Sequence, residues 1–345
     1  MIVKMLKNKF RGCLIGALVG DCFGAPYEGE SISSISRIQL QSYFDKLEGP
    51  PFLTPLYQYT DDTAMTKCIA ESLIQNNKFN ARDMAERFVK EFFRNPNRGY
   101  GENVCDVFHK FNNQNLENLW KPAQEQFNGS GSYGNGGAMR IAPISLFGFR
   151  DYDIMLDIVE NSTKLTHTHP LGINGAKLQA IAIFLAVRSD PEKPLDIAEY
   201  IKELINKISI VESRLNRVVP SEYSYKNQLL KIHRLLELGD KAVPHLVVEK
   251  LGNSVSAMFS VPTAIYCFLR AQQSIADIET NNPFRRTIQY AVSLGGDTDT
   301  IASMAGAIAG AYYGIDVIHK NLQQLAEGSD MINELAIRLC DQVTH

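Results

Sequence analysis

Apolar residues recur at helical spacing along most of the chain. Residues three and four apart lie on the same side of a helix, so each such run predicts a helix with one buried face. The clearest runs are residues 10–18, 65–74, 84–92 and 171–187. Alternating apolar and polar residues, which indicate strands, do not recur, and only residues 245–248 suggest a short one. The pattern therefore predicts an all-α protein.

Two of the expected helices carry further signals. Asn80 can cap the helix over residues 84–92, with Asp83 three residues later as its reciprocal partner. Residues 301–313 are apolar nearly all round, which predicts a buried central helix. The small residues that would let neighbouring helices approach it closely are Ala302, Ala305, Gly306, Ala309 and Gly310.

Composition adds little to this picture. The chain has 345 residues, of which 45% are hydrophobic and 21% charged, enough for a sizeable core. Length alone favours domains of about 150 residues each, but no linker, repeat or low-complexity tract divides the sequence. We therefore expect one compact domain over residues 1–345. The formal net charge of −3 gives no overall basic surface, so we expect no direct DNA binding.

The six cysteines are scattered and form no CxxC pair, which excludes zinc-finger and thioredoxin-like proteins. They are typical of reduced core residues, so we expect an intracellular protein, in the nucleus and cytoplasm or alternatively the mitochondrial matrix. The basic residues 1–11 favour a helix start over a transit peptide. The apolar residues 301–313 are too few to span a membrane. We expect no membrane contact and a monomer.

Two acidic clusters stand in front of expected helices. Thr60, Asp61 and Asp62 precede the second helix, where Thr and Asp are common N-caps. One aspartate suffices for capping, and two adjacent carboxylates repel, so the second needs another role. Asp297 and Asp299 precede the buried helix, with Thr298 and Thr300 beside them. Carboxylates aimed at a buried helix must be paired or must bind a cation.

Carboxylate and hydroxyl oxygens suit hard cations such as magnesium or manganese. Four aspartates would be enough for two closely spaced divalent ions that share a bridging carboxylate. A calcium loop is excluded, because Ile301 and Ala302 stand where that loop needs polar residues and glycine. Glu28 follows the first helix in a loop flanked by Pro26 and Gly29. It could reach the metals or transfer protons; the alternative is a solvated surface glutamate.

Residues 127–137 form a glycine-rich stretch that leads into an expected helix start at Ala138. Backbone amides ahead of a helix N-terminus bind anions. The stretch lacks the GK[ST] of a Walker loop and the preceding strand of a dinucleotide loop. Phe127 and Tyr133 could stack on a base; the alternative is a flexible surface loop. His167 and His169 form an HxH pair without further zinc ligands nearby, so we expect one polar ligand contact.

Together these motifs resemble the ADP-ribosylglycohydrolase superfamily. The resemblance runs from about Lys9 to the C-terminus, nearly the whole chain. Within the superfamily, residues 98–101, 127–129 and 261–267 are similar to the type 3, serine-specific branch. The strings that carry the family resemblance are FRGCL at 10–14, Gly20-Asp21, YTDDT at 59–63, GSYGNGGAMR at 131–140 and LGGDTDT at 294–300.

The resemblance implies an all-α orthogonal bundle with a binuclear magnesium centre. By family position, one Mg²⁺ ion would be held by Thr60, Asp61 and Asp62, and the other by Asp297 and Thr300, with Asp299 bridging. Glu28 would be the catalytic glutamate, on a flap that moves when substrate binds. Phe127 and Tyr133 would enclose adenine, and Gly101 and His167 would contact the phosphate and ribose region. The residues implied for the diphosphate and adenosine side are Gly131, Ser132, Tyr133, Gly134 and Asn135.

The implied function is magnesium-dependent removal of ADP-ribose from serine-linked ADP-ribosylated proteins, with poly(ADP-ribose) and O-acetyl-ADP-ribose as further substrates. One alternative is a non-catalytic ADP-ribose-binding module, although Glu28 and every acidic position are present. A second is an arginine-specific hydrolase of the same fold. A third is an all-α magnesium-dependent nucleotide pyrophosphohydrolase, although its usual ExxE spacing does not occur here at the acidic clusters.

Overall fold

The computed structural model describes residues 2–31, 33, 35–50, 52, 54–113, 116–213 and 223–344. Within these ranges every regular element is a helix, and β-pairing is confined to three isolated bridges. The all-α prediction is confirmed. In chain order the α-helices are α1 (Ile2–Gly24), α2 (Arg37–Glu48), α3 (Asp61–Asn76), α4 (Ala81–Arg94), α5 (Glu102–Asn113), α6 (Lys121–Gln124), α7 (Ala142–Phe147), α8 (Tyr152–Lys164), α9 (Pro170–Arg188), α10 (Ile197–Ser213), α11 (Tyr225–Leu238), α12 (Pro244–Leu251), α13 (Ala257–Arg270), α14 (Pro283–Ser293), α15 (Thr298–Tyr313), α16 (Lys320–Leu325) and α17 (Ser329–Thr344). Short 3-10 helices lie at Ala25–Tyr27, Gln126–Gly129, Asn135–Gly137, Gly239–Lys241 and Ile315–Val317.

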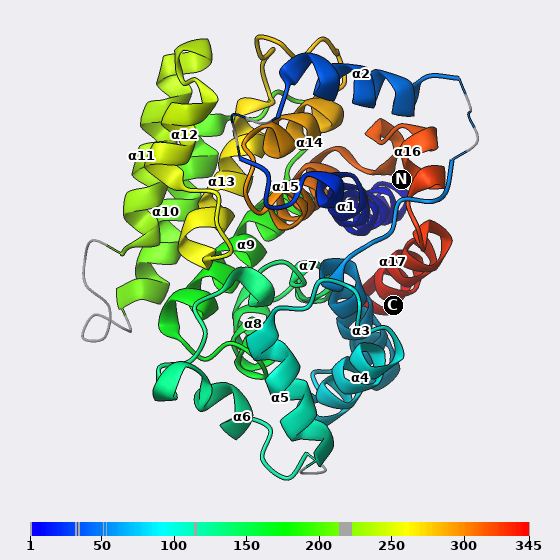
Figure 1. Cartoon of the computed structure of the whole chain (residues 1–345), viewed down its shortest axis with the longest axis vertical. Coiled ribbons are helices and arrows are strands. Elements are labelled where there is room, and N and C mark those ends of the chain that lie inside the picture. Colours follow the sequence, from blue (N-terminus) through cyan, green and yellow to red (C-terminus); the bar gives the residue numbers. More distant parts are fainter. Residues whose placement is uncertain are drawn as a thin grey trace.

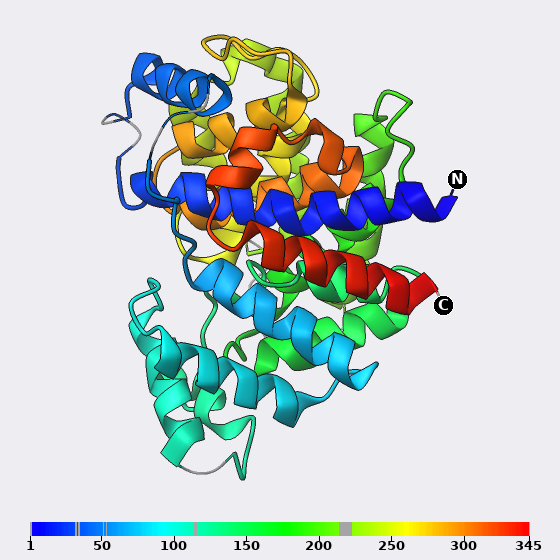
Figure 2. The ribbon, with the colours of Figure 1, turned by 90° about the vertical axis from the view of Figure 1, so that its right-hand side faces the viewer.

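The helices pack in successive layers (Figures 1 and 2). The layer of α10, α11 and α12 covers α9 and α13, which in turn contact α15. Helix α1 lies on α15, and α17 lies between α1 and α3. The expected central helix is confirmed, because every residue of α15 except Tyr313 is buried.

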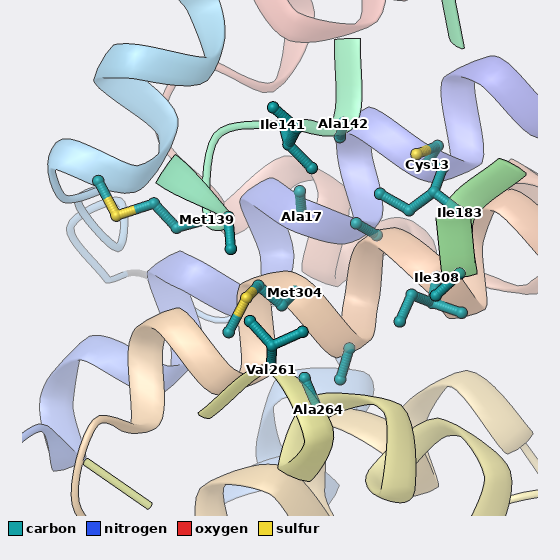
Figure 3. Packing of buried hydrophobic residues seen from close by; sticks show 14 of the residues in the cluster. Cys13, Ala17, Met139, Ile141, Ala142, Ile183, Val261, Ala264, Met304 and Ile308 are labelled. Carbon is teal, nitrogen blue, oxygen red and sulfur yellow. The ribbon is translucent and has the colours of Figure 1, made fainter. Parts of the chain in front are cut away.

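The core is continuous across these layers. Side chains from α1, α7, α9, α13 and α15 meet at its centre (Figure 3). Helix α9 is long and apolar enough to cross a membrane by length and composition, but 83% of that stretch is buried inside the fold. It serves here as a core helix. Core residues visible in Figure 3 include Cys13, Ala17, Met139, Ile141, Ala142, Ile183, Val261, Ala264, Met304 and Ile308.

Helices α1 and α15 meet backbone to backbone. Glycines recur every fourth residue on one face of α1, at positions 12, 16, 20 and 24. A Cβ added at Gly16 would lie 2.2 Å from the Gly306 carbonyl oxygen, and one at Gly20 would lie 2.1 Å from that of Ala302. No side chain fits at such distances, so any larger residue would push the helices apart. This glycine ladder brings the end of α1 against the start of α15.

Two local expectations are wrong. Residues 245–248 belong to α12 and form no strand: Pro244 fixes φ for the first helical turn, and Val247 and Leu251, four residues apart, are buried together.

Asn80 does cap α4, accepting from the Asp83 amide at 3.1 Å. The carboxylate of Asp83 does not return the bond; it accepts from Asn76 and Arg87 instead.

Candidate metal centre and ligand cleft

The two acidic clusters of the sequence meet at one place. Asp62, in the first turn of α3, and Asp299, in the first turn of α15, lie beside Asp21 near the end of α1. One carboxylate oxygen from each lies within 4.8 Å of the others, and all three residues are buried. Asp299 also forms a second group of this kind with Asp297 and Glu28. A single carboxylate thus belongs to both groups, as a bridging ligand would.

Thr60 and Asp297 occupy the N-cap positions of α3 and α15, but only Thr60 makes a capping hydrogen bond with its side chain. Thr60 is the N-cap of α3, and its hydroxyl accepts from the Asp62 amide at 3.3 Å. Asp297 occupies the N-cap position of α15 but makes no capping hydrogen bond with its side chain. The Thr300 hydroxyl donates to the carboxylate of Asp62 at 3.1 Å and so joins the two clusters. Asp61 faces the cleft above them.

Asp21 is the residue that the sequence analysis did not single out. It is fully buried, and its carboxylate accepts from the amides of Thr60 and Thr63 at 3.0 and 3.1 Å and from the Thr63 hydroxyl at 2.6 Å. These bonds hold the first turn of α3 against α1. A recognisable signal was present, because Asp21 is an acid at the end of an otherwise apolar helical face.

Arg98 also holds the backbone of residues 59–61 in place. Its guanidinium donates to the Tyr59 carbonyl at 2.8 Å and to both carboxylate oxygens of Glu327 at 2.6 and 2.9 Å. The amide of Asp61 donates to the Arg98 carbonyl at 2.7 Å. The backbone carrying Asp61 is therefore fixed by neighbours distant in sequence.

The carboxylates of the centre are buried close to one another, which disfavours their charged form. Burial raises the pKa of Asp62 and Asp299 well above the usual range, and the neighbouring carboxylates raise it further. Burial also raises the pKa of Asp61 to about 8 and raises the pKa of Asp297. Among the described residues, no Lys or Arg forms an ion pair with any of them. Clustered oxygen donors without a countercharge fit hard divalent cations.

A cavity of about 460 Å³ opens above the acidic groups. This volume is in the range of sites for small organic ligands. Of the residues expected to contact ligand, only Gly131 does not line the cavity; it packs against Thr168 and His169 instead. The structure adds Val255, which sequence patterns did not indicate. The lining includes Glu28, Asp61, Gly99, Gly101, Phe127, Ser132, Tyr133, Gly134, Asn135, Gly136, Arg140, His167, Val255, Asp297, Asp299 and Thr300.

Two aromatic rings that line the cavity face each other. The ring centroids of Phe127 and Tyr133 lie 6.3 Å apart at an interplanar angle of 25°. One planar base between two rings needs about 7 Å, twice the van der Waals spacing of roughly 3.5 Å. Both side chains are about half exposed, at 47% and 50%. Phe127 and Asn128 have φ of 51° and 56°, a left-handed backbone that is costly for residues with a Cβ and clusters at functional sites.

The glycine-rich stretch folds differently from the expectation. Residues 135–137 form a 3-10 turn and α7 begins only at Ala142, so the helix start expected at Ala138 is wrong. Pro143 has no backbone N–H and is well placed in the first turn of α7. Asn135 does not point freely at a ligand: its amide group donates to the carboxylate of Asp297 and to Ser260. It therefore links this stretch to the acidic centre.

Glu28 stands at the mouth of the cleft, just after the 3-10 turn Ala25–Tyr27. Backbone hydrogen bonds of 2.9 Å between residues 29 and 296 and between 296 and 30 hold its loop against the start of α15. Partial burial and the nearby Asp297 raise the pKa of its carboxyl group. A glutamate near the acidic centre with a raised pKa is suited to proton transfer.

The two histidines have separate surroundings. His169 caps α9, accepting from the Leu171 amide at 3.1 Å, and its ring meets the Tyr133 ring edge-on. His167 is buried and lines the cleft. They form no common metal site among the described residues.

An all-helical fold with buried carboxylates beneath an aromatic- and glycine-lined cleft agrees with the family expected from the sequence. The sequence model of the family described as ADP-ribosylglycohydrolase matches residues 3–345. The chain belongs to this family, and it is an ADP-ribosylhydrolase-type enzyme.

Individual relatives within this family are similar to the chain over nearly its whole length. The proteins named ADP-ribosylhydrolase ARH3 from Mus musculus and Homo sapiens are 42% and 41% identical to the chain over 341 residues. The matches cover 95% of this chain and 90% and 92% of theirs. A solved structure titled ADP-ribosylglycohydrolase-related protein complex covers 99% of both chains with a TM-score of 0.67; at 22% identity it shows the shared fold alone.

Proposed function

We propose that the chain is a magnesium-dependent hydrolase that removes ADP-ribose attached to proteins through serine oxygen. The observation that carries the proposal is that a carboxylate centre and a pair of facing aromatic rings line the same cleft. ADP-ribose has the matching ends: a ribose diol that can chelate metal and an adenine that can stack. The name of the ARH3 relatives supports ADP-ribosylated substrates.

We assign the metal ligands as the family resemblance implies. One ion is held by Thr60, Asp61 and Asp62, the other by Asp297 and Thr300, and Asp299 serves both. Its membership in both carboxylate groups supports the bridging assignment. Magnesium is the proposed ion because every candidate donor is oxygen. When bound, the two divalent ions supply orientation of the ribose and a lowered pKa for water.

The chain's own groups provide the remaining chemistry. Glu28 exchanges a proton with the attacking water or the departing serine oxygen. We expect the transition state to carry oxocarbenium character at the ribose, as in other glycosidic cleavages. Phe127 and Tyr133 hold adenine, and Gly101, Ser132 and Gly134 leave room for the ribose and diphosphate. Binding of the distant adenosine thus orients the bond to be cleaved.

Further substrates follow from the same chemistry. Poly(ADP-ribose) and O-acetyl-ADP-ribose also present an oxygen-linked anomeric ribose, so we propose both as substrates. We place the protein inside the cell, in the nucleus and cytoplasm; its six unpaired cysteines, five of them buried, support a reducing compartment.

One assay separates the alternatives. The protein is incubated with serine-linked and arginine-linked ADP-ribosyl peptides and with nucleoside triphosphates, each with magnesium or with a chelator. Release from the serine peptide that stops with chelator is the expected result. Release from the arginine peptide alone, cleavage of triphosphates alone, or binding without turnover would each replace the proposal with the corresponding alternative. A Glu28→Gln sample controls for contaminating hydrolases.

A further inference from the structure

A buried guanidinium lies behind the cleft. Arg140 is fully buried, and among the described residues it has no carboxylate partner. Its Nη2 donates to the Ser162 carbonyl at 3.2 Å and to the Thr166 hydroxyl at 2.7 Å, while Nε has no hydrogen-bond partner. The charge of Asp61 and the Phe88 ring, whose centroid lies 4.7 Å from the guanidinium carbon, offset part of the cost of burying this cation. Its hydrogen bond to Thr166 leads toward a second residue of the cleft, His167.

The contact with Thr166 continues to the cleft. The Thr166 Oγ1 lies 2.7 Å from Nδ1 of His167. A guanidinium can only donate, so the Thr166 hydroxyl accepts from Arg140. The other polar contact of that hydroxyl is His167 Nδ1, so we assign the hydroxyl proton to this contact, which makes Nδ1 the acceptor and puts the ring proton on Nε2. Burial and the charge of Arg140 lower the pKa of His167 to about 3, so the ring is neutral.

The Nε2 atom faces the glycine-rich stretch. A Cβ added at Gly136 would lie 3.0 Å from it, and one at Gly134 3.3 Å. Both glycines and His167 line the cleft. The absence of side chains at 134 and 136 therefore leaves the N–H open to a ligand there. Arg140 is also the single positively charged residue in the described lining, where all other charged groups are acids.

We propose that Arg140 and Thr166 are positioning residues that fix His167 as an Nε2–H donor to the diphosphate of ADP-ribose. The inference rests on the proposed function for the identity of the ligand. Thr166 determines which nitrogen of His167 carries the proton. Arg140 orients Thr166 and adds positive potential behind a doubly charged diphosphate, which the acids of the cleft would otherwise repel.

Three threonine variants test the chain of contacts without removing a charge. Thr166→Val replaces the hydroxyl with a methyl group of similar size, and Thr166→Ser keeps the hydroxyl. Thr163→Val is the matched control, since Thr163 is a buried threonine of α8 whose hydroxyl has no hydrogen-bond partner. Nitrogen-detected NMR of the histidine rings reports the tautomer, with His167→Ala for assignment. Calorimetry with saturating magnesium gives Kd for ADP-ribose and for adenosine.

The expected result is an Nε2–H tautomer in the wild type, in Thr166→Ser and in Thr163→Val. Thr166→Val should show a mixture of tautomers and a Kd for ADP-ribose raised about fivefold, the effect of one weakened hydrogen bond. The Kd for adenosine, which has no phosphate, should not change. Arg140→Met should raise the Kd for ADP-ribose further, because both the charge and the orientation of Thr166 are lost.

Other outcomes overturn the inference. A proton on Nδ1 in the wild type, or unchanged Kd and tautomer in Thr166→Val, removes the role of Thr166. An equal loss of adenosine binding would mean general damage to the cleft. These readouts do not depend on turnover: if serine-linked peptides are not cleaved but the pattern holds, the proposed substrate fails and the inference stands. If ADP-ribose does not bind the wild type, both fail.

Discussion

The carboxylate centre and the pair of aromatic rings in the cleft, called below the acidic end and the proposed nucleotide end, are built in different ways. At the acidic end, Asp21, Asp62 and Asp299 sit on regular helices, are buried, and are held by hydrogen bonds and by the glycine ladder. At the proposed nucleotide end, Phe127 and Tyr133 come from short turns between α6 and α7. Their backbone is partly left-handed, and the rings of Phe127 and Tyr133 are half exposed.

The difference follows from the kinds of interaction involved. Clustered carboxylates repel, and their spacing must match the coordination of small ions to a fraction of an ångström, which a rigid helical frame can maintain. Stacking on adenine tolerates small displacements, and every base has a face to stack on. We therefore expect changes at the acidic end to lower kcat or metal affinity, and changes at the nucleotide end to raise KM.

The largest effect is expected for Glu28→Gln. The amide keeps the size of the side chain but cannot exchange a proton, so kcat should fall about 1,000-fold while KM for a serine-linked peptide changes little. Steady-state kinetics in saturating magnesium measure both. A rise in KM as large as the fall in kcat would contradict a proton-transfer role.

Asp297→Asn should weaken metal binding by about 100-fold or more. The asparagine carbonyl can still accept from Asn135, so the fold should persist. Titration of magnesium into the variant, followed by calorimetry, gives the affinity, and circular dichroism verifies the helices. Metal affinity equal to that of the wild type would remove Asp297 from the ligands.

Tyr133→Ala tests the opposite end. Loss of one stacking face should raise KM about tenfold with kcat within a few-fold of the wild type. The matched control is Tyr223→Ala, an exposed tyrosine outside the cleft lining, which should change neither constant. A fall in kcat without a change in KM would show that the two ends do not divide the work as argued.

The smallest effect concerns stability without metal. Acids whose pKa is raised in the folded state favour folding below their unfolded pKa, and this contribution is lost as pH rises through the folded value. For Asp61 this window runs from about 4 in the unfolded chain to about 8, and Asp62 and Asp299 shift in the same direction. In chelator, Tm should therefore fall by about 3 °C or more between about pH 6 and about pH 8.

Magnesium should abolish that fall, because the bound cations neutralise the ionised carboxylates. Thermal scans at both pH values, with and without magnesium, make the comparison. Asp62→Asn should reduce the fall in chelator. A Tm that stays constant or rises with pH in chelator would show that the carboxylates are not under the strain that their burial implies.

The sequence allowed a more complete prediction of the acidic centre than of the glycine-rich stretch at residues 127–137. A buried helix behind Asp297 and Asp299 made a cation site a direct physical inference, and the two clusters do meet. Asp21 was noted only as part of the family resemblance and not as a site residue, because its contacts depend on the approach of α3, which periodicity cannot show. The sequence also could not predict the turn at residues 135–137 or the hydrogen bond from Asn135 to Asp297. Glycine permits many backbone conformations, and tertiary contacts select one of them.

The glycine ladder makes the tolerance of the chain to mutation uneven. Any substitution of a glycine adds at least a Cβ, and at Gly12, Gly16 and Gly20 that atom would collide with the backbone of α15. None of these positions lines the cleft. Substitutions there would nevertheless displace Asp21 from Asp299, so in a screen for lost activity they would resemble lesions of the catalytic machinery. Inherited variation in the interior of α1 thus bears on chemistry as directly as variation among the acids.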